Sequence, residues 1–226
     1  MKYLPTKSLL FACAVVLSSA ACAADQQVET LLAHMREAYK AVKSATYKVA
    51  ATVPESGAAG KEQTYSMDAA YKSPNMMRFI LKGSAFENRT ATLISDGENI
   101  TVTAPEGTAP VGVYSAETID KFVPFNLESI CFWDWDRQLS TAPGKNMEKS
   151  TFKIVKDETW DGKHWIVLEE TAAKDNVFCR YFIDPKTYLI WRTRVTVLSS
   201  GKLQMDAKLI SLNPNANLND GMFKGA

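Results

Sequence analysis

The chain has 226 residues, with 26 basic and 25 acidic side chains, two histidines and four cysteines. This balance, without any run of like charge, gives no electrostatic basis for binding nucleic acid or an anionic membrane. The histidine and cysteine spacings match no zinc site, and phosphate-loop, dinucleotide-binding and nucleophile-elbow motifs are absent. We therefore expect a non-enzymatic protein without a metal or a cofactor.

Residues 1–23 have the layout of a secretory signal peptide. Two lysines precede the short apolar run Leu9–Leu17, and an A-x-A cleavage motif occupies residues 21–23. We predict cleavage after this motif, which leaves residues 24–226 as a single domain in the periplasm. The alternative is that Cys22 ends a lipobox and carries a lipid anchor.

Apolar residues recur at helical spacing between Gln26 and Lys43. The pattern predicts an amphipathic helix whose apolar stripe must lie against another apolar surface. The stripe consists of Val28, Leu31, Leu32, Met35, Tyr39 and Val42.

Alternation of apolar and polar residues, typical of strands, follows the helix. It begins at Tyr47–Val53 and continues through residues 64–103, where a Pro-Asn turn and the pair Asp96-Gly97 separate further strands. Asp-Gly suits the two positive-φ positions of a type I′ hairpin, so we predict that turn type here. Residues 103–124 contain Pro and Gly at short intervals and are predicted to form an irregular loop, with a short helix at 115–122.

The C-terminal half shows the same alternation from Phe152 to Leu212, with a hairpin at Asp161-Gly162. Sequential hairpins favour a mainly β (α+β) fold built on one large, strongly curved antiparallel sheet. The concave face of that sheet must be covered, because an open apolar surface would aggregate. The N-terminal helix and the aromatic-rich region 115–135 are the available covers.

A series of short motifs spans most of the chain after the signal peptide. Lys-x-Pro-Asn (72–75) ends one strand, Arg78-Phe79 lies in the next, and Leu-Ile-Ser-Asp-Gly (93–97) follows; Phe-Ile-Asp-Pro-Lys-Thr (182–187) and Phe223 stand near the C-terminal end. In order and spacing, these motifs resemble those of the LolA-like outer-membrane lipoprotein carrier and sorting proteins. The resemblance implies a half-open barrel that is closed by a helical lid.

One position departs from the pattern of that family. In the well-studied carriers an arginine precedes the strand-breaking proline and holds the lid by hydrogen bonds, whereas this chain has Ser73 there. A neutral hydroxyl cannot make the same forked, charged contacts. Arg78 is the candidate for a substitute lid contact.

The candidate lipid-binding residues are apolar side chains expected on the concave face. Met and aromatic side chains adapt to varied apolar shapes, and an acyl chain of roughly 16 carbons gains about 12 kcal/mol on burial, at about 0.8 kcal/mol per methylene. Each candidate is equally consistent with plain core packing. The candidates are Tyr47, Val49, Tyr65, Met67, Met77, Phe79, Phe125, Phe132, Trp133 and Trp165.

Cys131 and Cys179 are the two cysteines outside the signal peptide. In an oxidising compartment they are predicted to form a disulfide that contributes about 2–4 kcal/mol. Two unpaired, buried thiols are the alternative.

These observations favour a monomeric periplasmic carrier that holds acyl chains of lipids or lipoproteins in a concave β cavity. Its expected partners are those acyl chains, with an inner- or outer-membrane protein as a further candidate. Two alternatives keep the same fold. One is a lipid-sensing regulatory or protein-binding domain similar to envelope-stress regulators, and the other is an exported structural domain with a filled core.

Overall fold

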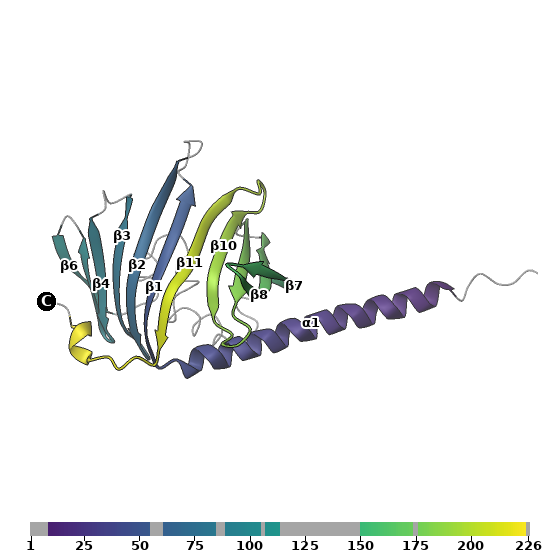
Figure 1. The fold of residues 1–226 in the computed structure, drawn as a ribbon, viewed down its shortest axis with the longest axis horizontal. Coiled ribbons are helices and arrows are strands. Elements are labelled where there is room, and N and C mark those ends of the chain that lie inside the picture. Colours follow the sequence, from purple (N-terminus) through teal and green to yellow (C-terminus); the bar gives the residue numbers. More distant parts are fainter. Residues whose placement is uncertain are drawn as a thin grey trace, which may run out of the picture.

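The computed structural model of the protein describes residues 9–54, 61–84, 89–104, 107–113, 150–173 and 176–224. This part of the chain comprises one long helix, an eleven-stranded antiparallel sheet and a short C-terminal 3-10 helix (Figure 1). The region 115–135, predicted to contain a short helix and the lid, lies outside the described residues.

The helix α1 spans Leu9–Ala41 and therefore begins well before the predicted boundary at Gln26. The earlier start follows from the composition of the preceding residues, because leucine and alanine are strong helix formers. The N-terminal part of α1 extends away from the sheet, whereas its C-terminal part packs against it (Figure 1). Within the described residues, no helix combines the length and apolarity needed to span a membrane.

The strands of the sheet follow one another as hairpins. The sheet order is β6-β5-β4-β3-β2-β1-β11-β10-β9-β8-β7, so the first and last strands pair at its centre. The bounds are β1 (Ser44–Pro54), β2 (Glu62–Lys72), β3 (Met76–Gly83), β4 (Thr90–Asp96), β5 (Asn99–Ala104), β6 (Gly107–Val113), β7 (Ser150–Trp160), β8 (Lys163–Ala172), β9 (Val177–Ile183), β10 (Ile190–Val197) and β11 (Leu203–Pro214), followed by the 3-10 helix η5 (Asp220–Phe223).

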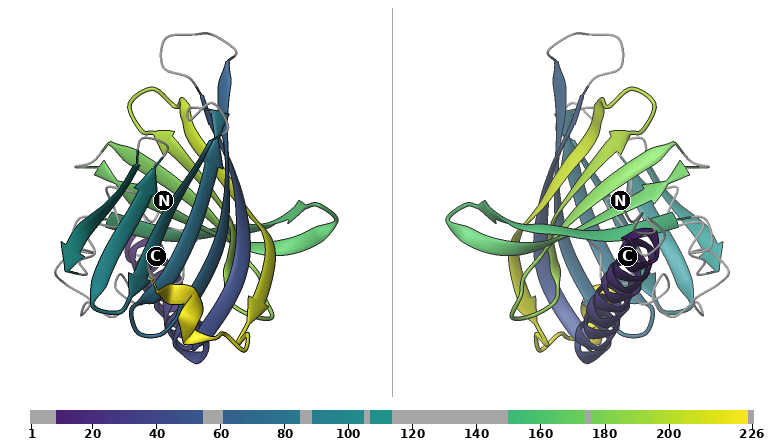
Figure 2. Two further views of the ribbon diagram at one scale, coloured as in Figure 1. Left: turned by 90° about the vertical axis from the view of Figure 1, so that its left-hand side faces the viewer. Right: turned by 90° about the vertical axis from the view of Figure 1, so that its right-hand side faces the viewer.

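The sheet is a barrel that does not close. Strands β6 and β7 are its two edges, and they do not pair with each other among the described strands. The two halves of the sheet nevertheless curve toward each other (Figure 2). A β-bulge between β1 and β11 at Lys48/Val49 interrupts the central pairing, and bulges of this kind increase local twist. The predicted large, curved and half-open antiparallel sheet with a covering helix is confirmed.

The two Asp-Gly hairpins use different turns. Asp161 and Gly162 both have positive φ, 53° and 70°, and connect the paired residues Trp160 and Lys163, as a two-residue type I′ loop requires. At the other hairpin Gly97 has a φ of 104°, whereas Asp96 is not in the positive-φ region.

The type I′ turn predicted at Asp96-Gly97 is therefore wrong. The Asp96 carboxylate accepts hydrogen bonds from the amides of Glu98 and Asn99, at 2.9 and 2.8 Å. These two bonds hold the pKa of Asp96 below its ordinary value. The aspartate side chain thus organises a wider turn by accepting hydrogen bonds from backbone amides, as Asp and Asn side chains often do in turns.

The irregular loop predicted after residue 103 is also incorrect, because β6 forms there. Pro110 lies in this strand, and proline is tolerated at the edge of a sheet, where one side of the strand needs no ladder hydrogen bonds. The register shifts between Ile100 and Thr101 of β5, which places Gly112 and Pro110 opposite consecutive residues. An edge position combined with a bulge therefore makes a strand from a Pro- and Gly-rich stretch.

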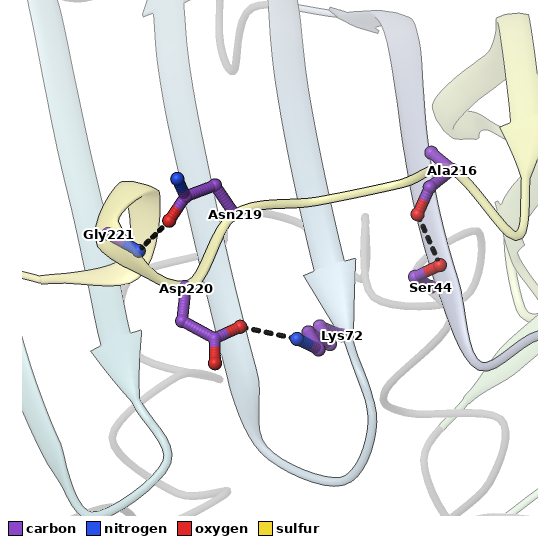
Figure 3. A network of polar contacts seen from close by, with 6 residues as sticks. All are labelled: Ser44, Lys72, Ala216, Asn219, Asp220 and Gly221. Atoms are coloured by element: carbon purple, nitrogen blue, oxygen red, sulfur yellow. Dashed lines mark hydrogen bonds and ion pairs between the residues drawn. The ribbon is translucent and has the colours of Figure 1, made fainter.

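Alternate residues of each strand point to opposite faces of the sheet. One face contacts α1 and carries a single cluster of buried apolar side chains from the strands and the helix. We call it the inner face and the opposite one the outer face. The C-terminal tail crosses the outer face, as the contact between Lys72 of β2 and Asp220 of η5 indicates (Figure 3).

Candidate functional site

The inner face brings together six of the predicted binding residues. Strand register places Val49 beside Met67, and the neighbouring pairing places Phe79 next to Ala69 on the same face. All six are buried, with exposures of 5% or less, and belong to one apolar cluster. They are Tyr47, Val49, Tyr65, Met67, Met77 and Phe79.

The C-terminal part of α1 covers this surface. The whole predicted stripe, from Val28 to Val42, is buried in the same cluster as the sheet residues. The helix is also fixed by a polar contact, because the Tyr39 hydroxyl accepts a buried hydrogen bond of 3.1 Å from the amide of Ile190 in β10. The inner face is therefore filled by a segment of the chain itself.

Methionine is prominent where helix and sheet meet. Met35 of α1 and three methionines of the sheet are each at most 2% exposed. Flexible, polarizable thioethers fill irregular gaps and tolerate changes in the shape of what they contact. The sheet methionines are Met67, Met77 and Met205.

Three polar side chains lie close together on the inner face of β8 and β9. The Tyr181 hydroxyl donates a 2.6 Å hydrogen bond to a carboxylate oxygen of Glu170, and Cys179 pairs with Glu170 across β8 and β9. Burial, reinforced by the charge of Glu170, raises the pKa of Tyr181 well above its usual range and that of Cys179 to about 12. The thiol is protonated at neutral pH, so it is not a nucleophile there.

Sequence reasoning missed Tyr181 and Glu170 as members of the inner face. The alternation of Cys179, Tyr181 and Ile183 with Phe178, Arg180 and Phe182 is visible in the sequence. The pairing of β8 with β9 that brings Glu170 to them depends on register, which the alternation alone does not give.

Trp165 does not join the other candidates. It lies on the outer face with Val167 and Phe182 in a second, smaller apolar cluster. Its indole N–H donates a 2.9 Å hydrogen bond to the carbonyl of Trp160, across the β7–β8 hairpin. Both faces of β8 are buried, so the size and apolarity of Trp165 do not reveal the face to which it points.

Three of the predicted binding residues, Phe125, Phe132 and Trp133, lie outside the described residues, as does Cys131. Cys179 is a free, buried thiol in the structure, and its pairing with Cys131 stays a prediction.

Arg78 points to the outer face. It lies on β3 between Met77 and Phe79, whose side chains are completely buried on the inner face. This placement separates Arg78 from the surface that a lid over the inner face would cover. Across the described residues, no group of three or more histidine, cysteine, aspartate or glutamate side chains is arranged to hold a metal ion.

Comparison with known protein families and with curated protein sequences finds no match. Among solved structures, the crystal structure of MucB matches with a TM-score of 0.55 and 13% identity over 89% of this chain. An uncharacterized conserved protein from Thermus thermophilus matches with a TM-score of 0.52 and 8% identity, over 88% of this chain and 94% of that one. The LolA superfamily protein NE2245 from Nitrosomonas europaea matches with a TM-score of 0.42 and 13% identity, over 87% and 97%.

These likenesses concern the fold alone, because all the identities are low. This chain spans 63% of the length of MucB. The half-open antiparallel sheet that the sequence motifs imply is present, and this fold is shared with MucB and with the Thermus thermophilus protein.

Proposed function

We propose that the protein binds acyl chains of lipids or lipoproteins on its inner face and carries or sorts them in the periplasm. The observation that supports this most directly is the cover of the inner face: a broad apolar surface lies under the stripe of one amphipathic helix. An acyl chain offers the same apolar contact. Binding then consists of the acyl chain replacing part of the stripe of α1.

The energies of the two covers are of the same order. The stripe contributes six buried side chains, each worth about 1.5–3 kcal/mol on burial. An acyl chain of roughly 16 carbons gains about 12 kcal/mol. A near balance suits a carrier, because a carrier must release its cargo as well as bind it.

The lining supports exchange between covers of different shape. Met35, Met67, Met77 and Met205 surround the contact between α1 and the sheet, and thioether side chains repack at low cost. The Tyr39 hydroxyl accepts a buried hydrogen bond from the amide of Ile190, and this bond must break when α1 moves. We propose binding without catalysis.

Native mass spectrometry of the protein purified from the periplasm, followed by lipid extraction, tests this function. The proposal predicts acylated cargo in a stoichiometric amount. The same spectra report whether residues 1–23 are removed or Cys22 is lipidated. A clean mass without cargo, together with no uptake of a fluorescent fatty acid, would contradict the carrier and leave a filled core.

A second candidate is a regulatory domain that binds a protein partner. The filled state of the inner face favours it, because the described apolar candidates are already buried by the chain itself. Structures of MucB include one in complex with MucA(peri). Copurification of a stoichiometric protein partner without lipid supports this second function over the first.

A further inference from the structure

The outer face has a pocket of about 330 Å³, lined by β1, β2, β3, β11 and η5. Two rows of neighbouring side chains cross these strands. In one row, Arg78 lies beside Ala70, which lies beside Thr46. Ala70 is small, and its position between two longer side chains creates the floor of the pocket.

The second row forms one side of the pocket. Ile80 lies beside Asp68, which pairs with Lys48 and in turn Ser211 of β11. Lys48 and Asp68 form an ion pair with a separation of 2.8 Å between Nζ and Oδ1. Both charges are more than half exposed and line the pocket as a pair, and Ile80 and Ser211 add an aliphatic side chain and a hydroxyl to this side.

The C-terminal tail forms another wall. Ser44 donates a 2.7 Å hydrogen bond to the carbonyl of Ala216, and Lys72 contacts the carboxylate of Asp220 (Figure 3). Three residues after Asp220, Phe223 is completely buried. These contacts hold the tail on the outer face and place Met222 at the pocket.

Arg78 is the cation of the pocket that remains uncommitted. Within the described residues it forms no ion pair and no hydrogen bond, and its Nε atom is buried without a partner. A buried donor without an acceptor is unfavourable, and a guanidinium is suited to bind carboxylate or phosphate oxygens through a planar fork of N–H groups. The Nε donor without a partner among the described residues is therefore suited to an anionic oxygen.

We propose that this pocket binds a short amphiphile with an anionic oxygen head, either a carboxylate or a phosphate. Arg78 holds the head, and the apolar stem lies over Ala70 against Ile80 and Met222. The volume lies at the lower end of the range for small-molecule pockets, which favours a short stem. The site is on the face opposite the acyl-binding surface, so it does not depend on the function proposed above.

The test is isothermal titration of the mature protein with four probes: octanoate, octyl phosphate, octanol and inorganic phosphate. The proposal predicts that at least one of the two anionic amphiphiles binds at least tenfold more tightly than octanol and inorganic phosphate. Which of the two binds more tightly identifies the head as carboxylate or phosphate. Equal binding of octanol, or no binding of either anionic amphiphile, overturns the proposal.

Three variants locate the bound amphiphile. Arg78→Gln is expected to weaken binding at least tenfold, whereas Arg78→Lys, which keeps the charge without the fork, weakens it less. Lys82→Gln is the matched control, because Lys82 lies on the same strand and face but does not line the pocket. Its affinity is expected to stay within twofold of the wild type, and an equal loss in both Gln variants overturns the specific role of Arg78.

A fourth variant and a spectroscopic readout separate this site from the inner face. Met222→Ala alters the tail and not the sheet, and it is expected to weaken binding at least threefold. Backbone amide NMR shifts on titration are expected at Thr46, Ile80 and Ser211. Shifts confined to inner-face residues such as Met67 would place the ligand on the other surface and refute the outer site.

Discussion

The inner and outer faces of this sheet are made by the same strands but are stabilised in different ways. The inner face is one continuous apolar cluster under α1. The outer face combines ion pairs, a small apolar cluster around Trp165 and the C-terminal tail. The difference shows that an apolar helix covers one face of this open barrel, whereas local ion pairs, a small cluster and the tail stabilise the other.

Among the described residues, several ion pairs lie on the outer face of the C-terminal half. Arg192 binds both carboxylate oxygens of Asp206, at 2.8 and 2.5 Å, and the Arg192 guanidinium lies 4.9 Å from the centre of the Trp160 ring. Arg180 bridges Glu169 and Glu158 at 2.9 and 2.8 Å. Charged side chains here cover apolar rings, so a part of the outer cluster is shielded without a helix.

The largest expected effect comes from opening a cavity under α1. Phe79→Ala removes a completely buried ring from the inner face and is expected to lower the free energy of unfolding by about 3–5 kcal/mol. Lys82→Ala, on the outer face of the same strand, is expected to change it by less than about 0.5 kcal/mol. Urea denaturation measures both, and similar losses would contradict the contrast between the faces.

A smaller loss is expected at the polar contact of the helix. Tyr39→Phe leaves the buried amide of Ile190 without that acceptor and is expected to destabilise the protein by about 1–3 kcal/mol. Lys40→Gln, at an exposed position of the same helix, is the control. Equal stability of the Tyr39 variant and the control in urea titrations would show that this hydrogen bond does not hold α1.

The outer-face pair of Arg192 and Asp206 should contribute less. Asp206→Asn weakens a bidentate contact between side chains that are 14% and 16% exposed, and about 1–2 kcal/mol of stability is expected to be lost. A double-mutant cycle with Arg192→Gln measures the coupling between the two side chains. A coupling near zero would mean that packing of Arg192 on Trp160, and not its charge, stabilises this face.

The smallest effect at neutral pH concerns Cys179 in the reduced protein. Burial keeps its thiol protonated in the folded state up to a pKa of about 12, whereas an unfolded thiol ionises near pH 8.5. The contribution of Cys179 to the unfolding free energy is therefore constant below about pH 8 and falls as the pH rises toward 12. Tyr181, whose pKa is also raised, contributes to the fall above pH 10.

Chemical unfolding between pH 7 and 11 checks this sign. The slope of the unfolding free energy against pH reports the number of protons released on unfolding. Cys179→Ala is expected to lower that number by up to one per molecule, and the slope above pH 10 that arises from Tyr181 is expected to remain. A thiol reagent at pH 8 should label Cys179 only after unfolding. Rapid labelling at Cys179 in the folded, reduced protein would show that this thiol is not buried.

Much of the fold is predictable because periodicity is a local property of the sequence. Alternation at Tyr47–Val53 and at Tyr65–Tyr71 identifies both strands and their inner faces, and the stripe of α1 is visible at helical spacing. The structure differs from the sequence prediction where the conformation depends on tertiary or side-chain contacts. Pro110 is compatible with a strand because β6 is at an edge of the sheet. The turn type at Asp96 is set by the hydrogen bonds that its carboxylate accepts from the backbone.

The candidate site is predictable in its apolar part and not in its polar part. Met67, Met77 and Phe79 follow from alternation, but Trp165 lies on a strand with two buried faces, so its direction is not encoded in its type. The contact of Tyr181 with Glu170 depends on register between strands. The missing hydrogen-bond partner of the Arg78 Nε atom is a feature of the tertiary structure, which sequence alternation does not reveal.

Competition between α1 and an acyl chain is the central claim, and it is tested by comparing the uptake of a fluorescent fatty acid by two variants. Leu32→Ala weakens the cover of the inner face, and Val167→Ala removes a buried side chain of the outer cluster. Because a larger fraction of binding-competent protein raises the apparent affinity, Leu32→Ala is expected to bind the probe severalfold more tightly than the wild type. Val167→Ala should match the wild type, whereas no uptake by any form, or the same gain in both variants, would contradict the account.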